Sequence, residues 1–301
     1  MKVSDYLSRD EVVYFTRRNN WRAWAILLGN WSMIAAIFFV VAIWPNPFFL
    51  ILAVILLAGR QMGLAVLMHD CGHGTFFNSR VLNDFVGQWL CALPIMNDQP
   101  SYARGHLEHH RHAGTQADPD LSNYQAYPIS RESFKRKVIR DLTGRTGYKL
   151  IAFMTVRLIE AIKRGDHALA WSYFQPYLAQ LLLFVALSAF GIPWAYLLWV
   201  TAYMTFFMLI IRVRQVAEHA AVPDLYDPDT RLNTRSVDAP WWQRWAMVPN
   251  GVNYHLEHHF MASVPCYRLR ALRELLKSRH ALDDVPAFSG YGALLKHVVV
   301  A

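Results

Sequence analysis

The sequence predicts an all-α integral membrane protein, with four transmembrane helices in two hairpins and a cytosolic helical cap that holds a histidine-rich metal site. Three observations lead to this fold class. The 301 residues are 54% hydrophobic and 17% charged, with a mean hydropathy of +0.15, whereas soluble domains carry about 25% charged residues. Residues 23–59 and 172–211 contain no charged side chain. Histidines gather in three short clusters outside these two stretches.

The composition also argues against several other classes of protein. Cys71, Cys91 and Cys266 form no CxxC pair, so we expect a reducing environment, no disulfide framework and no four-cysteine iron–sulfur cluster. The net charge of +8 is expected of loops that face an anionic membrane leaflet, and we expect no nucleic acid partner. The N-terminus is polar and mixed in charge, unlike a secretory signal peptide.

Each uncharged stretch is long enough for two crossings, since one crossing needs ~20 residues. The first is broken by Trp44-Pro45-Asn46-Pro47 and the second by Gly191-Ile192-Pro193, and both Pro and Gly interrupt helices. We therefore expect helices at 24–44, 48–68, 171–190 and 194–212. They form hairpins within 24–68 and 171–212, while 69–170 and 213–301 form the cap of a single domain covering 1–301.

Both predicted hairpin turns are short and uncharged. Every Lys and Arg therefore falls in the N-terminal segment, the central loop, the C-terminal region or a helix end that faces them. The positive-inside rule places all three regions in the cytoplasm. Arg60 and Gln61 interrupt the second helix. The Arg60 charge either reaches the membrane interface or makes a polar contact inside the bundle.

Two stretches outside the predicted crossings have interfacial character. Residues 240–245 read PWWQRW and are aromatic and basic, as expected at the level of lipid headgroups. From Tyr267 to Arg279, leucines recur at helical spacing among basic residues. This pattern predicts an amphipathic helix that lies either on the membrane or against the rest of the domain.

The histidine clusters predict one site for two metal ions. They are His69-x-x-x-His73, His106-x-x-His109-His110 and His255-x-x-His258-His259. Residues three and four apart lie on one face of a helix, so each cluster directs several imidazoles to one point. Eight histidines are too many for one zinc ion, which usually takes four ligands, and imidazole also binds iron and copper. All three clusters fall on the predicted cytoplasmic side.

His219 is a further candidate ligand, because it follows the fourth predicted helix and emerges on the same side. The histidines outside this set are expected to be solvated, or in the case of His112 to lie near the site without binding metal. They are His112, His167, His280 and His297.

Metal-bound imidazoles usually donate their second N–H to a carboxylate or a carbonyl. The candidate carboxylates, which spacing does not separate, are Asp70, Glu108, Asp118, Asp120 and Glu257. Cys71 lies between two candidate ligands, but residue i+2 of a helix points away from residue i. We therefore expect Cys71 to pack in the protein interior.

With these clusters in place, the chain resembles the membrane fatty acid desaturase and hydroxylase superfamily. His69-Asp70-Cys71-Gly72-His73 is similar to the first histidine box of acyl-lipid desaturases. The HLEHH strings at 106–110 and 255–259 match the second and third boxes in order and spacing. The resemblance runs from the first hairpin to about Arg270 and is more specific for the superfamily than for a substrate. Met261-Ala262-Ser263 departs from it, because many members carry a proline-containing turn there.

The resemblance implies a non-haem di-iron site held by the histidine boxes and His219, beneath a cytosolic cap on four transmembrane helices. In the acyl-CoA branch of the family, an asparagine four residues before the isolated histidine contacts one iron through water. Gln215 holds that place before His219. The Glu218-His219 pair resembles a bacterial subgroup that includes hydroxylases, and we expect the bacterial inner membrane as the location. Since no haem-binding, ferredoxin-type or GxGxxG motif is present, electrons must come from a separate ferredoxin or reductase.

These features favour oxygen-dependent oxidation of an unactivated C–H bond on a lipid acyl chain, with O2 as co-substrate and a double bond as the product. The alternative is a hydroxylase or ketolase acting on a fatty, terpenoid or carotenoid chain, because both reactions begin with the same hydrogen abstraction. A metal-binding membrane transporter is a more remote alternative. A transporter should place polar ligands near the bilayer midplane, where the uncharged hairpins carry none.

Overall fold

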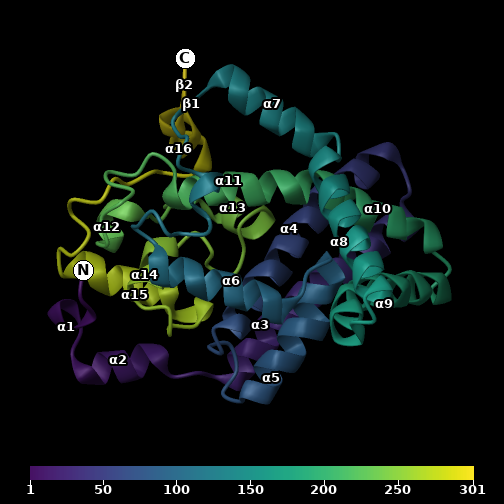
Figure 1. The fold of residues 1–301 in the computed structure, drawn as a ribbon, viewed down its shortest axis with the longest axis horizontal. Coiled ribbons are helices and arrows are strands. Elements are labelled where there is room, and N and C mark those ends of the chain that lie inside the picture. Colours follow the sequence, from purple (N-terminus) through teal and green to yellow (C-terminus); the bar gives the residue numbers. More distant parts are fainter.

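The computed structural model describes all residues from Met1 to Ala301 and is largely helical (Figure 1). The α-helices are α1 (Val3–Tyr6), α2 (Arg9–Thr16), α3 (Asn20–Ile43), α4 (Pro47–Gly72), α5 (Arg80–Phe85), α6 (Gln99–His112), α7 (Arg131–Leu142), α8 (Arg145–Lys163), α9 (His167–Ala189), α10 (Tyr196–Ala202), α11 (Met208–His219), α12 (Thr230–Asn233), α13 (Trp241–Ala246), α14 (His255–Phe260), α15 (Cys266–Ser278) and α16 (Tyr291–Val298).

Short irregular elements connect several of these helices. They are the π-helical turns η1 (Val86–Ala92) and η5 (Tyr203–Phe207) and the 3₁₀ turns η2 (Leu93–Ile95), η3 (Leu121–Asn123) and η4 (Pro193–Ala195). The two-residue strands β1 (Ile129–Ser130) and β2 (Val299–Val300) pair in parallel and tie the C-terminus to the start of α7.

Three helical segments are long and apolar enough to cross a membrane. They are α3, α4 and the continuous run Pro193–His219, which comprises η4, α10, η5 and α11. The helix α9 begins four residues before the predicted range of 171–190 and ends one residue before its end, and it does not reach the same hydropathy. The structure therefore confirms a largely helical protein with three apolar segments that are long enough to cross a membrane. The fourth crossing stays a prediction.

The turn between α3 and α4 lies within the predicted break at residues 44–47. Asn46 caps α4 by accepting a hydrogen bond from the Phe49 N–H at 3.2 Å, and Pro47 occupies the first turn, where no N–H is needed. The two helices pack closely at Gly63, where an added Cβ would lie 2.3 Å from the Asn30 side-chain oxygen. Small residues thus bring α3 and α4 together.

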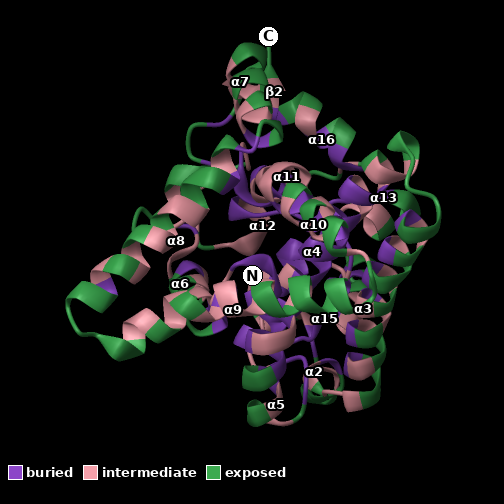
Figure 2. Ribbon diagram, turned by 90° about the vertical axis from the view of Figure 1, so that its right-hand side faces the viewer, coloured by how far each residue is buried: buried purple, intermediate pink, exposed green.

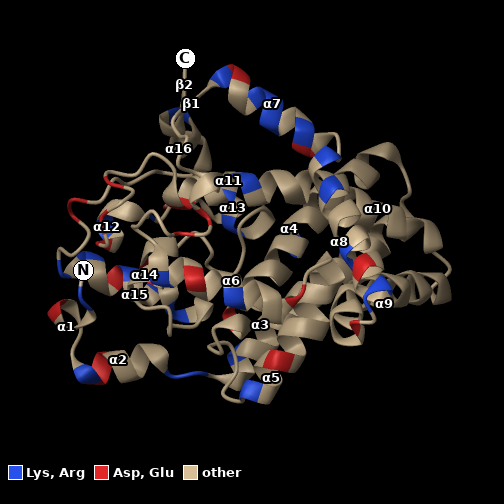
Figure 3. Ribbon diagram, viewed as in Figure 1, with Lys and Arg blue, Asp and Glu red and all other residues tan.

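The helix α4 is the central element of the fold. It packs against α3, α6, α10 and α13 and is mostly buried (Figure 2). Its last turn lies near α6, α14 and α15, in the region that the sequence predicts as the cap (Figure 1). Charged residues gather on α7, on α15 and in the loop that leads to α12, whereas α10 carries none (Figure 3). The end of α4 therefore lies where the apolar helices meet the charged part of the molecule.

The amphipathic helix predicted at 267–279 forms as α15, and its leucines face the domain. Leu269, Leu272 and Leu276 are buried in a core cluster that also contains Phe15 and Phe77. Packing against the domain therefore accounts for the leucine pattern. In contrast, Trp241, Trp242 and Trp245 in and around α13 remain largely exposed, as the interfacial interpretation of 240–245 predicts.

Arg60 makes the polar contact inside the bundle that was one of its two predicted roles. Its side chain is 5% exposed and donates to the backbone carbonyl of Trp245, above whose ring the guanidinium lies at 5.8 Å. An added Cβ at the neighbouring Gly59 would lie 1.7 Å from the Ala246 carbonyl oxygen. The Trp-rich segment is therefore held directly against α4.

Candidate metal centre

Four elements deliver nine imidazoles to one region of the cap. The last turn of α4 contributes His69 and His73, and α11 ends at His219. The helix α6 supplies the histidines of the second cluster, and the six-residue α14 supplies those of the third. Figure 1 shows α4, α6, α11 and α14 converging, although they are far apart in the sequence.

The nine side chains divide into two groups. Within each group the ring nitrogens that face one another all lie within 4.8 Å. The first group is His69, His73, His106, His110 and His258, and the second is His109, His219, His255 and His259. We call them the five-histidine group and the four-histidine group.

Helical spacing explains how the two HLEHH strings are shared between the groups. In α6, His106 and His110 are four residues apart and join the five-histidine group, while His109 joins the other. In α14 the arrangement is reversed: His255 and His259 join the four-histidine group. Each string therefore contributes an i, i+4 pair to one group and a single imidazole to the other, which couples the two groups through both helices.

Each group brings ring nitrogens into close approach. In the five-histidine group, His258 Nε2 lies 3.0 Å from His69 Nε2 and 2.8 Å from His110 Nε2. In the four-histidine group, His255 Nε2 lies 2.9 Å from His219 Nε2. With metal–nitrogen distances of about 2.1 Å, neighbouring ligand atoms lie roughly 3 Å apart. These separations therefore match the edges of a metal coordination polyhedron.

Acceptors on the outer side of the rings determine which nitrogen faces inward. His69 Nδ1 donates to Asp70 at 3.1 Å and His109 Nδ1 donates to Asp118 at 2.8 Å. His219 Nδ1 donates to the Asn233 carbonyl at 3.0 Å. A neutral imidazole that donates from Nδ1 presents a lone pair at Nε2. The inward nitrogens of these three rings are therefore acceptors, as metal ligands must be.

Lone pairs directed at one another in a buried space are unfavourable unless a cation or a hydrogen-bond donor lies between them. His73 Nε2 is an example, because this nitrogen is buried and has no hydrogen-bond partner in the protein. An orphaned buried nitrogen costs free energy unless it is hydrogen-bonded or coordinated. The donor set of neutral nitrogens suits iron, copper or zinc, so the residues present fit a transition-metal pair.

Burial keeps the imidazoles in their neutral form. Desolvation, reinforced by neighbouring histidines, holds the pKa of His258 and of His259 well below the usual value, and it lowers the pKa of His110 to about 3. Burial opposes ionisation of Asp118, but hydrogen bonds from His109 and Tyr124 outweigh it and lower its pKa. The rings are therefore neutral and their carboxylate partner is charged, which is the combination that binds a metal cation.

Of the side chains predicted to support the histidines, Asp70 contacts a ring, Glu108 faces away from the site and Gln215 lines the adjoining cavity. Asp70 contacts His69 and also accepts a hydrogen bond from the Cys266 N–H at 2.7 Å. Glu108 lies on the outer face of α6, where it contacts Arg111 and lies 3.5 Å from His112, so it does not support any of the nine imidazoles. The reason is the i+2 offset from His106, which turns Glu108 away. Gln215 lines the cavity beside the histidines.

Glu257 is fully buried but also makes no contact with a ring nitrogen. It accepts hydrogen bonds from Ser236 and from Arg273 Nη1, the latter at 2.6 Å, and so fixes α14 to its neighbours. Sequence reasoning did not identify Glu218 or Asn233 as ring partners. Glu218 lies 3.4 Å from His255 Nδ1. The Asn233 contact comes from the backbone, which no sequence motif reveals.

The histidines left out of the predicted ligand set lie outside both groups. His280 contacts Asp283, and His297 contacts the Ala221 carbonyl. Cys71 is completely buried and unpaired, in agreement with its predicted packing role.

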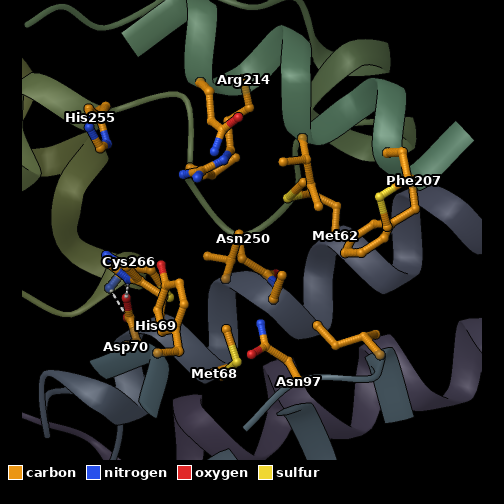
Figure 4. A pocket seen from close by; sticks show the side chains of 18 of the residues that line it. Met62, Met68, His69, Asp70, Asn97, Phe207, Arg214, Asn250, His255 and Cys266 are labelled. Atoms are coloured by element: carbon orange, nitrogen blue, oxygen red, sulfur yellow. Dashed lines mark hydrogen bonds and ion pairs between the residues drawn. The ribbon is translucent and has the colours of Figure 1, made fainter. Parts of the chain in front are cut away.

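A cavity of about 350 Å³ adjoins the five-histidine and four-histidine groups, lined largely by apolar side chains of α4, α8 and α11. His69 and His255 lie at one end, and Met62 and Phe207 lie at the other (Figure 4). This volume is in the range of small-molecule and cofactor sites, roughly 300–1,000 Å³. A long apolar molecule can therefore reach the histidines from between the helices.

Comparisons with known proteins agree with this geometry. The family described as fatty acid desaturase matches residues 45–290. The chain is 26% identical over 255 residues to the sn-1 acyl-lipid omega-3 desaturase (ferredoxin) of Synechocystis sp., covering 76% of this chain and 68% of that protein. It is 24% identical over 266 residues to the sn-1 oleoyl-lipid 12-desaturase of Anabaena variabilis, covering 81% and 70%. A shorter match, 36% over 104 residues, is to the zeaxanthin 4-ketolase of Chlamydomonas reinhardtii, covering 33% and 20%.

Proposed function

The chain belongs to the fatty acid desaturase family, and from this premise we propose that it is a membrane oxidoreductase that introduces a double bond into an acyl chain of a lipid, using O2. The observation that carries the proposal is the pair of histidine groups at the end of a largely apolar cavity. The acyl-lipid desaturases among its relatives support the same substrate class.

We propose that each histidine group holds one iron ion, so that all nine imidazoles are ligands. Bound iron would supply the redox chemistry of O2 activation and hydrogen removal. Gln215 is the proposed water-mediated contact to the site, since it lines the cavity four residues before His219. Asp70 and Asp118 hold His69 and His109 in the orientation that metal binding needs.

The overall reaction balances when two electrons and two protons come from outside the substrate. Two hydrogens leave neighbouring carbons, O2 is reduced to two waters, and the carbons form a double bond. The protein's share is to bind the chain in the apolar cavity, direct one C–H bond at the histidines and exclude bulk water. The donor is proposed to be a separate ferredoxin or reductase, and one relative's name specifies ferredoxin.

We further propose four membrane crossings, with both termini and the histidines on the cytoplasmic side of a bacterial inner membrane and with 1–301 forming one domain. A count of crossings supports this topology. If His112 and His219 lie on one side, the chain between them crosses an even number of times. The run Pro193–His219 is one candidate crossing, and we propose α9 as the other, because it carries no charged side chain whereas α8 carries several. Exposed Leu181, Leu182 and Val185 on α9 suit contact with lipid.

A hydroxylase or ketolase remains the second candidate, favoured by the match to the zeaxanthin 4-ketolase. That match covers a third of the chain, whereas the acyl-lipid desaturases cover most of it. Membership of the desaturase family gives no support to the metal-transporter alternative.

Mass spectrometry of lipids from cells with and without the gene tests the proposal. Desaturation predicts acyl chains lighter by two hydrogens, and these should be missing when His258→Ala replaces the wild type. A gain of one oxygen instead, with label retained from ¹⁸O₂, would establish the hydroxylase function. Unchanged lipids in the presence of an iron-loaded protein would contradict both candidates.

A further inference from the structure

The cavity contains polar side chains that the metal site does not explain. Arg214 and Asn250 lie between His255 at one end and Met62 and Phe207 at the other (Figure 4). Gln215 lines the same cavity, and its proposed water-mediated contact to the metal site uses one end of an amide that has both a donor and an acceptor. Polar groups in an apolar space are costly unless they are hydrogen-bonded. A cavity made for a plain hydrocarbon would gain from apolar residues at these positions.

Arg214 is fixed in place close to the histidines. One guanidinium nitrogen donates to Glu218 Oε1 at 2.9 Å, and the same oxygen lies 3.4 Å from His255 Nδ1. The Glu218 carboxylate therefore links the Arg214 guanidinium to the His255 ring of the four-histidine group. Arginine has five N–H donors, and Glu218 is the single protein acceptor within hydrogen-bond distance of this side chain. The remaining donors are free to bind a group in the cavity.

Asn250 and Gln215 add further unused hydrogen-bonding capacity. Asn250 has a left-handed backbone, with φ of 59°, and its Nδ2 donates to the Gly63 carbonyl at 3.1 Å. That bond orients the side chain and leaves the amide oxygen without a protein partner. The Gln215 side chain makes no hydrogen bond within the protein, although it lines the cavity. Donors and acceptors are thus present together in one cavity.

We propose that Arg214, Gln215 and Asn250 bind an oxygen-bearing group of the substrate, so that the oxidised carbon is set by its distance from that oxygen. The group is an ester carbonyl, a carboxylate or a hydroxyl, each of which accepts hydrogen bonds from a guanidinium. This inference rests on the proposed function and adds to it. The short path from Arg214 to His255 brings carbons near the oxygen to the histidines, while the apolar remainder extends toward Met62 and Phe207.

A series of lipids with acyl chains that differ by two-carbon steps tests the wild-type enzyme. We expect the new double bond, or the new oxygen, to keep a constant distance from the carbonyl as the chain lengthens. A constant distance from the methyl end would overturn the inference. Parallel assays with the free acids and with a hydroxylated terpenoid show whether ester, carboxylate or hydroxyl is the oxygen that binds.

The variant Arg214→Lys tests the side chain itself. Lysine keeps a positive charge for Glu218 but loses the planar fork that holds a second group. We expect bound iron to be retained and the oxidised position to spread over at least two neighbouring carbons. Arg270→Lys, an exposed residue of α15 paired with Glu274, is the matched control and should keep the wild-type position. A single wild-type position in Arg214→Lys would overturn the proposal.

If Arg214→Lys loses its iron, Asn250→Gly provides the deciding measurement. Glycine adopts the left-handed backbone without strain and removes the side chain, with its amide and the hydrogen bond to the Gly63 carbonyl. A shifted product distribution supports the proposal, and an unchanged distribution overturns it. No oxidised product from the wild type with any lipid would overturn the proposed function as well. An oxidised position that keeps a constant distance from the methyl end would overturn this inference but leave the proposed function in place.

Discussion

At the residue scale, the partner of an imidazole Nδ1 determines which ring nitrogen faces the centre of its histidine group. Asp118 and Glu108 belong to the same region of sequence, and both were candidates for this role. Asp118 is 6% exposed and bonded to His109, whereas the Glu108 carboxylate faces outward toward Arg111. The two carboxylates therefore have different expected effects when their charges are removed.

The variant Asp118→Asn should hold metal less tightly. Loss of the negative charge makes His109 a weaker ligand, and disruption of such partners typically costs about 10–100-fold in metal affinity or activity. Glu108→Gln is the matched control and should retain wild-type affinity. Iron retained during a chelator titration measures the difference. Equal loss in both variants would show that the His109–Asp118 hydrogen bond has no special role.

The variant His219→Ala should lower bound iron and abolish turnover, because the ring belongs to the four-histidine group and lies 2.9 Å from His255. His280→Ala should do neither, since His280 is exposed and contacts only Asp283. Metal analysis and product formation on the same preparations provide the measurement. If His219→Ala keeps full activity while His258→Ala loses it, His219 is not a metal ligand.

The histidine spacing predicted the residues of the site but not their division. Two strings with identical letters deliver opposite pairs to the two groups, His106 with His110 and His255 with His259. That difference depends on how α6 and α14 are oriented relative to α4, which is a tertiary property. The Asn233 carbonyl was beyond prediction for a similar reason, because any residue type can supply a backbone oxygen.

At the element scale, close contacts with α4 position the site. The last turn of α4 carries His69 and His73, so any movement of the helix moves two of the five histidines in that group. The carbonyl of Ala246 lies directly over Gly59. This contact holds α13 and the loop that leads to α14 against α4.

The variant Gly59→Ala should therefore destabilise the protein. Its methyl group would lie 1.7 Å from the Ala246 oxygen, and a backbone atom cannot rotate away as a side chain can. Overpacking of this kind typically costs about 1–3 kcal/mol. Gly29→Ala in α3 is the control, since nothing lies within 4 Å of its added Cβ. Thermal unfolding in detergent should show a lower midpoint for Gly59→Ala alone.

The amphipathic pattern of α15 predicted a helix but left its partner undecided. A membrane surface and a protein core select the same spacing of leucines, and here the core residues Phe15 and Phe77 are far away in sequence. Similarly, the arginine in α4 was recognised as unusual, but its acceptor, the carbonyl of Trp245, belongs to α13, which is distant in sequence. Local pattern predicts the element, and long-range contact decides what the element faces.

At the scale of the whole molecule, two separate histidine groups predict two bound metal ions. The wild type, expressed with ample iron, should contain about two irons per chain. His255→Ala removes a ligand from the four-histidine group alone and should lower the content toward one, because the five-histidine group stays intact. Elemental analysis measures both. One zinc and no iron in the wild type would contradict the di-iron proposal.

The proposed topology of the whole chain rests on the same convergence, and it can be tested with single cysteines. The native cysteines are all buried, so an introduced exposed cysteine is the main target of a thiol reagent. Asn46, Gly191 and Gln116 are exposed positions in the first turn, the second turn and the central loop. A reagent that does not cross membranes should label Asn46→Cys and Gly191→Cys in intact cells.

The same reagent should reach Gln116→Cys only after the cells are broken. The physical reason is that one site cannot collect ligands from both sides of a bilayer. Residues 112 and 219 must then lie on one side. Labelling at Gly191 therefore requires one crossing by Pro193–His219 and a second between residues 112 and 191, for which α9 is the proposed helix although Gln175 and Gln180 lower its hydropathy. Labelling of Gln116→Cys in intact cells would place the central loop outside. No labelling at Gly191 would mean that neither segment crosses, and the four-crossing topology would be wrong.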